Sequence, residues 1–353
     1  MTRPHRRPGE DVARPSPTAP LQLLLASAPG PAAAVAAVRG AEYTVLCRGP
    51  VGESTRFETG SLTKTFTALL LAELAARGEV GYGDRADRYL PFRLPGPPLT
   101  LLHLATHTSG LPRLPPGLLG RAVRGGWFSN PYAGFSEDDL LASLRRTRLR
   151  NRPGTRVLYS NFGGGLLGHL LARAAGGTGS DYPALLAERV TGPLGLTDTD
   201  CDPNRPQATG HWHGRPRPAL LMPGLTAAGA VRSSVRDLLR VLTVLLDPET
   251  APGPALRTAL TEVQRPRLSV PRTGSRLCLI WNLRPRPGGA LLHHSGGTRG
   301  FTAFAGFLPG SGTGLVALTN TAPTPLAPFV QSAYGALREL DATPSATVWT
   351  ARV

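Results

Sequence analysis

Residues 57–67 read FETGSLTKTFT, and this stretch is the strongest single indication of what the chain is. Ser61 and Lys64 are three residues apart, so in a helix both side chains lie on one face. We predict a helix over residues 61–77, ended by Gly78. Ser61 then falls in the first turn, where free N–H groups and the helix dipole stabilise negative charge. Because burial can turn lysine into a base, the pair indicates a nucleophile and its activating group.

Lysine occurs only once in the 353-residue chain. Of the 39 Lys and Arg residues, one is Lys64 and the other 38 are arginine. Arginine stays protonated in proteins, whereas a buried lysine can change its pKa and act as a base. Chance is the alternative explanation of the spacing. On average usage, a lysine has a serine three positions before it in roughly 5–7% of cases. The pair alone is therefore weak evidence.

A second candidate motif is Tyr159-Ser160-Asn161, directly before a glycine-rich helix predicted for residues 163–175. A tyrosine near the serine could relay a proton to the leaving group, and an asparagine amide could hold a substrate carbonyl. Taken alone, the motif is better explained as a capped helix start with a packed tyrosine.

The third motif is His294-Ser295-Gly296-Gly297, in a run that enters a predicted strand. A strand at this point could pair with an extended substrate. The backbone N–H near Gly297 could complete an oxyanion hole with that of Ser61. A simple β-turn is the better explanation if the motif stands alone.

The order of predicted elements indicates an α+β fold. Strands are predicted at residues 32–38, 43–48, 277–283, 290–293, 301–307 and 314–318, and further helices at 99–107, 138–146, 182–190, 235–246 and 326–340. Because strands lie at both ends, we expect one antiparallel sheet flanked by helices, plus a mainly helical lobe. The expected boundaries are tails at 1–20 and 346–353 around one domain at 21–345, with a sheet lobe at 21–80 and 220–345 and a helical lobe at 81–219.

Composition argues against several classes of partner. The net charge is +16, but the arginines are scattered and no basic helix carries interleaved aromatic residues, so no nucleic-acid partner is expected. Cys47, Cys201 and Cys278 are odd in number and widely spaced, which predicts isolated buried thiols. His211 and His213 have no further ligands nearby, so neither a metal nor a cofactor is expected.

The N-terminal region does not resemble an export signal. The apolar stretch of residues 21–38 begins late and is broken by Pro29 and Pro31. No run of about 18 uninterrupted apolar residues predicts a transmembrane helix. A cytoplasmic protein is therefore expected, with secretion as the alternative if the start codon is misassigned.

Together the three motifs resemble those of the class C β-lactamase and DD-peptidase superfamily of serine hydrolases, over about residues 28–340. This superfamily also includes esterases and transacylases. The resemblance rests on residues 57–67 and on further stretches in the same order, namely Tyr89-Leu90-Pro91, His107-Thr108-Ser109-Gly110-Leu111-Pro112, Pro153-Gly154, Tyr159-Ser160-Asn161, Gly192-Pro193-Leu194-Gly195-Leu196, Ala228-Gly229, Ser233 to Asp237 and His294 to Phe301.

The resemblance implies a role for each matching residue. Ser61 is implied to be acylated by an ester or amide, with Lys64 as its base and Tyr159 as its proton shuttle. Asn161 is implied to contact the carbonyl on the acyl side. The element His294-Ser295-Gly296, followed by Gly297, stands where many β-lactamases have Lys-Thr-Gly.

Two departures from the pattern matter. Histidine at 294 is expected to be neutral near pH 7 and to recognise carboxylates more weakly than lysine, which disfavours efficient β-lactamase activity. Cys278 and Ile280 stand where relatives often have glycine, so their bulk either reshapes the pocket or packs the core.

We therefore expect a serine hydrolase that acts through an acyl-enzyme on a small-molecule ester, amide or D-amino-acid peptide. A broad esterase or amidase ranks first, a DD-peptidase second and an efficient β-lactamase third, with transacylation as a further alternative. A non-catalytic penicillin-binding sensor is the alternative from another class. The presence of all the reactive side chains argues against it.

Overall fold

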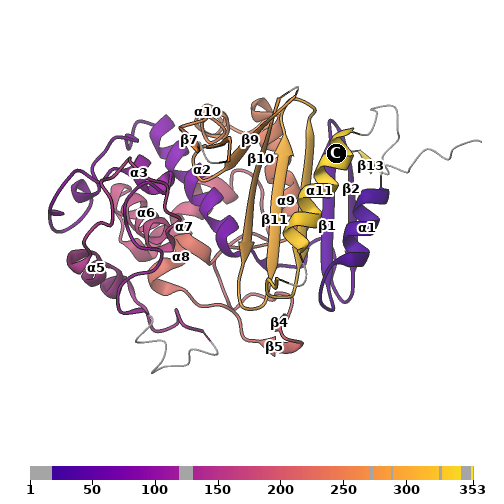
Figure 1. Cartoon of the computed structure of the whole chain (residues 1–353), viewed down its shortest axis with the longest axis horizontal. Helices are drawn as coiled ribbons and strands as arrows, with labels where there is room; N and C mark the ends of the chain where they lie inside the picture. The colour runs from indigo at the N-terminus through magenta and orange to yellow at the C-terminus, as the bar shows by residue number, and fades with distance from the viewer. Residues whose placement is uncertain are drawn as a thin grey trace, which may run out of the picture.

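A nine-stranded antiparallel sheet forms one side of the molecule (Figure 1). The computed structural model describes residues 18–118, 130–270, 273–287, 289–325, 328–342 and 351–352. Within these residues the strand order is β13-β2-β1-β12-β11-β10-β9-β8-β7. The strands are β1 (Ala33–Arg39), β2 (Glu42–Arg48), β7 (Leu268–Val270), β8 (Ser275–Leu277), β9 (Asn282–Arg286), β10 (Gly289–Gly297), β11 (Thr302–Leu308), β12 (Thr313–Thr319) and β13 (Ala351–Arg352). The predicted α+β class with an antiparallel sheet is confirmed.

Strand β1 shows why this sheet is covered on both faces. Val35 belongs to an apolar core with α1 (Ala19–Ser27) and α11 (Phe329–Ala342). Val38 belongs to the larger core on the opposite face, where α9 (Val235–Leu246) packs. Because successive side chains of a strand point to opposite faces, the apolar run of β1 contributes to both cores.

The remaining helices gather beyond one edge of the sheet (Figure 1). They are α2 (Thr63–Ala76), α3 (Leu101–Ala105), α5 (Glu137–Arg146), α6 (Asn161–Ala174), α7 (Tyr182–Leu186), α8 (Thr226–Gly229) and α10 (Pro254–Glu262). Helix α2 is buried from Thr63 to Leu74 and packs against α6, α8 and α10. Helix α2 is therefore the central helix of this group. Two small sheets, β3 (Phe57–Glu58) with β6 (Arg232–Ser233) and β4 (Gly210–Trp212) with β5 (Arg215–Arg217), complete the fold.

The strand predicted at residues 277–283 is wrong in its middle. The chain leaves β8 after Leu277 and re-enters the sheet as β9 at Asn282. Ile280 has a φ of 66° and donates its N–H to the carbonyl of Ala105 at 2.9 Å. A positive φ is costly for a β-branched residue, so the turn is held by this contact and by burial of the Ile280 side chain.

The predicted tails and thiols also need correction. Helix α1 begins at Ala19, inside the tail predicted for residues 1–20, whose first 17 residues lie outside the described part. Ala351–Arg352 pair with β2, inside the tail predicted for 346–353. Cys47 is a free thiol as predicted, but it is exposed.

No helix of the described residues is both long and apolar enough to cross a membrane.

Candidate active site

Ser61 lies at the junction between the sheet and the central helix. It sits in the 3₁₀ turn Gly60–Leu62, which leads directly into α2. Its Oγ accepts hydrogen bonds from Lys64 Nζ at 3.1 Å and from the hydroxyl of Tyr159 at 2.5 Å. Two groups capable of moving a proton therefore meet at one partly exposed hydroxyl.

Lys64 is held as a buried amine. Its side chain is 0% exposed, and its Nζ also donates to the carbonyl of Ala228 at 2.7 Å. No carboxylate forms an ion pair with it among the described residues. Burial lowers the pKa of Lys64 from 10.5 to about 7, and the positive charge of Arg113 contributes in the same direction. A substantial fraction of the lysine is therefore neutral at neutral pH.

The ring of Tyr159 lies close to the side chains of Lys64 and Arg113. Lys64 Nζ lies 4.9 Å from the centre of its ring and the Arg113 guanidinium carbon 5.6 Å. Burial raises the pKa of Tyr159, against its hydrogen bond with Ser61 and the charge of Arg113. The ring of His107 packs on Tyr159 with centroids 4.5 Å apart. The phenol therefore keeps its proton and a fixed position next to Ser61.

The last residues of β10 lie against the backbone of Ser61. A methyl group at Gly296 would come within 2.8 Å of the Ser61 nitrogen, and one at Gly60 within 2.7 Å of the Gly297 nitrogen. Only glycine permits this approach, which explains the glycines that the third motif carries. Ser61 and Gly297 thus belong to neighbouring segments, and both residues line the cavities at this site.

Strand β10 presents an unpaired edge to the cavity. Thr298 donates its N–H to Phe301 across the end of the β10–β11 pair, so alternation turns the backbone groups of Ser295 and Gly297 away from β11. On that other side β9 ends at Asn282, paired with His293. The edge beyond His293 therefore remains open to an extended ligand.

His294 is buried and uncharged. It is 5% exposed, and its Nδ1 has no hydrogen-bond partner. Burial lowers its pKa well below 6.5, and the charge of Lys64 adds to this effect. The expectation that this histidine is neutral near pH 7 therefore agrees with its surroundings.

Two cavities meet at Ser61. One, of about 230 Å³, is lined mainly by apolar side chains, among them Leu114, Leu220 and Met222. The other, of about 800 Å³, contains Tyr159, His294 and β10 residues 295–297. Asn161 lines both cavities, and its Oδ1 is buried without a partner. An acceptor without a donor in a cavity wall fits a residue that binds a substrate group.

The glycines of α6 make room for the lysine and for its backbone partner. A methyl group at Gly164 would lie 3.0 Å from Lys64 Cε, and one at Gly168 would lie 2.1 Å from the Ala227 side chain on α8. Thr67 donates to the carbonyl of Ala227 at 2.8 Å. Helices α2, α6 and α8 are thus fixed together around the Lys64 amine.

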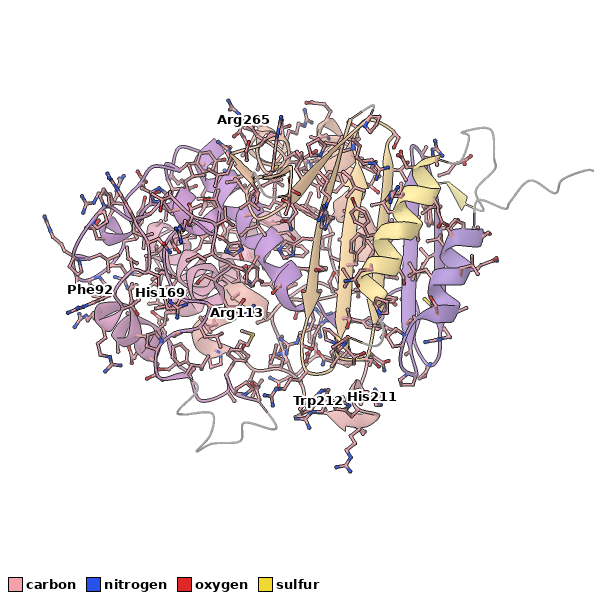
Figure 2. All side chains as sticks on the ribbon, viewed as in Figure 1. Phe92, Arg113, His169, His211, Trp212 and Arg265 are labelled. Atoms are coloured by element: carbon pink, nitrogen blue, oxygen red, sulfur yellow. The ribbon has the colours of Figure 1, made fainter. Side chains whose placement is uncertain are left out.

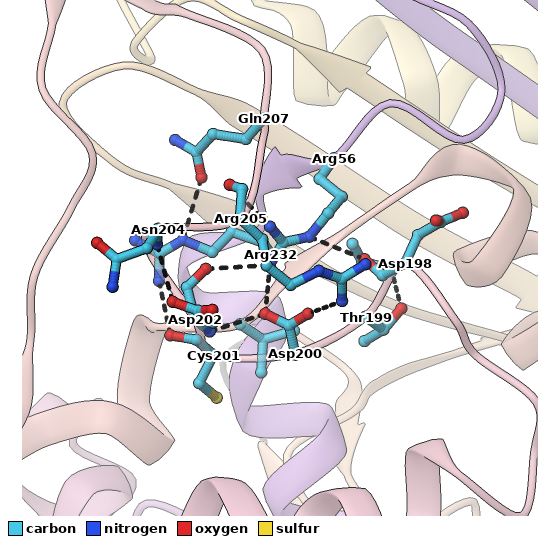
Figure 3. A network of polar contacts seen from close by, with 12 residues as sticks. Arg56, Asp198, Thr199, Asp200, Cys201, Asp202, Asn204, Arg205, Gln207 and Arg232 are labelled. Carbon is cyan, nitrogen blue, oxygen red and sulfur yellow. Dashed lines mark hydrogen bonds and ion pairs between the residues drawn. The ribbon is translucent and has the colours of Figure 1, made fainter.

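A buried arginine network holds the segment that follows α8. Arg232, on β6, is 1% exposed and donates to the carbonyl of Ala230 at 2.6 Å and to Gln207 at 3.1 Å. Arg56 forms an ion pair with Asp200 in the same network (Figure 3). Strand β6 pairs with β3, which ends three residues before Ser61, so the network is connected to the segment that leads into Ser61.

Replacing Arg232 with methionine is expected to lower the free energy of unfolding by about 3–5 kcal/mol, because it leaves the buried Glu58 carboxylate without its cation and several buried carbonyls without their donor. Urea unfolding followed by circular dichroism measures this change. Arg265→Met is the matched control, because Arg265 is 67% exposed and its pair with Glu262 is worth at most about 1 kcal/mol. Equal stabilities of the two variants would contradict a structural role for the network.

Sequence reasoning missed three contributors to the site. They are Arg113, which follows the His107–Pro112 motif directly, Tyr132, which lines both cavities, and the carbonyl of Ala228. Figure 2 shows Arg113 between the helices and the sheet. Only its place next to a known motif could have singled out Arg113. Among the described residues no three His, Cys, Asp or Glu side chains gather as metal ligands.

The fold and site together define a class of protein. A solved class C beta-lactamase aligns with a TM-score of 0.78 over 92% of this chain and 95% of that chain, at 22% identity. The family model Beta-lactamase matches residues 22–337. The chain therefore belongs to the beta-lactamase family, whose members are serine hydrolases, and the resemblance predicted from the motifs is confirmed.

Two proteins that are similar to this chain carry names that give different activities. The D-alanyl-D-alanine-carboxypeptidase/endopeptidase AmpH of Escherichia coli K12 is 29% identical over 280 residues, which cover 74% of this chain and 70% of the relative. A beta-lactamase of Pseudomonas fluorescens is 28% identical over 331 residues, covering 83% and 86%. The similarity therefore spans most of both proteins without favouring one of the two activities.

Proposed function

We propose that the chain is an acyl-serine hydrolase of esters or amides, with Ser61 as its nucleophile. The observation that carries this proposal is the convergence of Lys64 Nζ and the Tyr159 hydroxyl on Ser61 Oγ, at 3.1 and 2.5 Å. A serine hydroxyl is a weak nucleophile unless a neighbouring base removes its proton. Family membership supports the same chemistry.

In the acylation step Ser61 Oγ attacks the substrate carbonyl while neutral Lys64 accepts the serine proton. The raised pKa of Tyr159 makes it a proton relay instead of a phenolate base. It passes a proton to the departing alcohol or amine as the bond between carbonyl carbon and leaving group breaks, and the proton that Lys64 accepted from Ser61 replaces it. Water then attacks the acyl-serine ester while Lys64 accepts a proton from it. The bond to Ser61 Oγ breaks, the acid is released, and that proton returns to Ser61.

The developing oxyanion requires donors on one side of the carbonyl. We assign this role to the N–H groups of Ser61 and Gly297, because β10 lies directly against the Gly60–Leu62 turn. Asn161 is assigned to hold a polar group of the acyl portion, since its buried Oδ1 lacks a partner. Ser295 and Gly296 shape the strand edge along which the substrate lies.

The neutral state of His294 favours esters and amides over substrates bound through a carboxylate at that position. An esterase or amidase therefore ranks first and a DD-peptidase second, as the name of the AmpH relative suggests. Efficient β-lactamase activity ranks third, and transacylation requires only that an alcohol or amine replace water.

A non-catalytic penicillin-binding sensor is the competing proposal. It predicts stable acylation without turnover, whereas an enzyme predicts a burst followed by steady product release. Time courses with chromogenic esters and cephalosporins distinguish the two, and acylation that never turns over would reject the hydrolase. The same panel, extended to D-amino-acid peptides, ranks the substrate classes.

The pKa of Lys64 predicts how activity depends on pH. Because the amine acts as a base only when deprotonated, kcat/KM for a neutral ester should rise about tenfold per pH unit below about pH 7 and level off above it. Arg113→Gln removes a cation that lowers this pKa, so its inflection should move to higher pH. A flat profile through neutrality in the unmodified protein would rule out Lys64 as the base.

A further inference from the structure

A groove next to the apolar cavity at Ser61 is used by no part of the proposed mechanism. This groove has a volume of about 400 Å³, and its lining includes prolines 112, 115 and 116 together with Arg146, Arg148 and Arg150. Leu114 lines both the groove and the apolar cavity. The two hollows therefore share a wall.

The segment that carries the arginines is fixed to the active-site motif by its backbone. Arg150 donates its N–H to Gly110 at 2.8 Å, and Gly154 donates to Thr108 at 2.9 Å. A methyl group at Gly110 would lie only 2.3 Å from the Asn151 carbonyl oxygen. The arginine side of the groove is therefore attached to the segment that packs beneath Tyr159.

The three arginines are exposed, and no carboxylate neutralises them. None of them forms an ion pair in the part of the chain that the structure describes, whereas Arg265 and Arg267 are both paired with Glu262. Residues 140–160 contain six arginines and no Asp or Glu. Guanidinium groups bind carboxylates and phosphates through paired hydrogen bonds, so this groove suits an anionic group.

The position of Tyr159 decides which part of the substrate reaches the groove. Tyr159, the proton relay to the leaving group, lines the larger cavity and not the apolar one. With Tyr159 as the relay, the leaving group belongs in the larger cavity, which leaves the apolar cavity to the acyl portion. Leu114 then lies between the acyl portion and the groove.

We infer that the acyl portion of the substrate is apolar next to the reacting carbonyl and ends in an anionic group bound by Arg146, Arg148 and Arg150. This inference rests on the proposed acyl-serine chemistry, which it narrows to acyl groups with a terminal carboxylate or phosphate. The bond changes are those already described, and the anionic end takes no part in them.

The test compares p-nitrophenyl esters of linear fatty acids with those of ω-carboxylated acids of matched chain length. The unmodified protein should show about tenfold higher kcat/KM for the anionic ester at the best length. The variant carrying Arg146→Glu, Arg148→Glu and Arg150→Glu should lose or invert this ratio. High salt should also reduce it in the unmodified protein, because the ion pairs are solvent-exposed.

A matched control carries Arg240→Glu, Arg276→Glu and Arg338→Glu, which change the net charge equally at exposed sites outside the groove. It should keep the tenfold ratio. Equal rates for both ester series in the unmodified protein, or an unchanged ratio in the groove variant, would overturn the inference.

Calorimetry separates failure of this inference from failure of the proposed chemistry. In Ser61→Ala, an aliphatic dicarboxylic acid should bind more tightly than the monocarboxylic acid of equal length, and the groove substitutions should abolish the difference. This readout needs no turnover. Absence of ester hydrolysis together with this binding preference would reject the acyl-serine proposal and keep the groove, whereas equal binding of both acids would reject the groove.

Discussion

Ser61→Ala is expected to lower kcat/KM for a chromogenic ester by at least about 10⁴-fold, because it removes the hydroxyl on which Lys64 and Tyr159 converge. The loss should appear in kcat, since the cavity walls that bind the substrate remain. Ser61 is also the residue that a fluorophosphonate probe should modify, which peptide mass spectrometry can locate.

The matched control is Ser332→Ala, on the exposed side of α11. This variant should keep full activity and full labelling. Circular dichroism should show that both variants are folded, so that the comparison reports chemistry. If Ser61→Ala retained half of the activity, or if the probe modified another serine, the nucleophile assignment would be wrong.

Lys64→Met is expected to lower kcat/KM by about 10²–10⁴-fold, because a thioether of similar length cannot accept the serine proton. The same variant should be more stable near neutral pH. A lysine pKa lowered from 10.5 to about 7 corresponds to about 4 kcal/mol of lost stability there, whereas the carbonyl of Ala228 left without its donor costs about 1–3 kcal/mol.

The lowered pKa of Lys64 also determines how the free energy of unfolding depends on pH. The unfolded chain binds a proton at Lys64 more tightly than the folded chain, so stability contributed by this site rises with pH between about 7 and 10.5. Urea unfolding of the unmodified protein and of Lys64→Met over this range measures it. A methionine variant that is less stable and yet fully active would contradict both the lowered pKa of Lys64 and its role as the base.

Local spacing explains why much of the site could be predicted from the sequence. Ser61 and Lys64 lie three residues apart, and the helix rule placed them on one face. Tyr159 is 98 residues from Ser61, and no propensity indicates that these two side chains touch. Only the ordered resemblance predicted their meeting, which the structure now shows at 2.5 Å.

The parts that escaped prediction depend on tertiary contacts. The run at Cys278–Trp281 is as apolar as a strand, but the contact of Ile280 with Ala105 turns it out of the sheet. Arg113 acts through space on Tyr159 and Lys64, and only the folded chain brings the groove arginines to the same hollow as Leu114 and the prolines. Sequence periodicity carries none of this information.

Because Lys64 is the only lysine and is buried, proteolysis at this residue can report local unfolding of the protein. A lysine-specific endoproteinase has one internal cleavage point, after Lys64, and that bond lies inside α2, where every residue from Thr63 to Leu74 is buried. Cleavage there requires the central helix to open. The rate of this single cut therefore measures how often the packing around the Lys64 amine opens, without any label or engineered site.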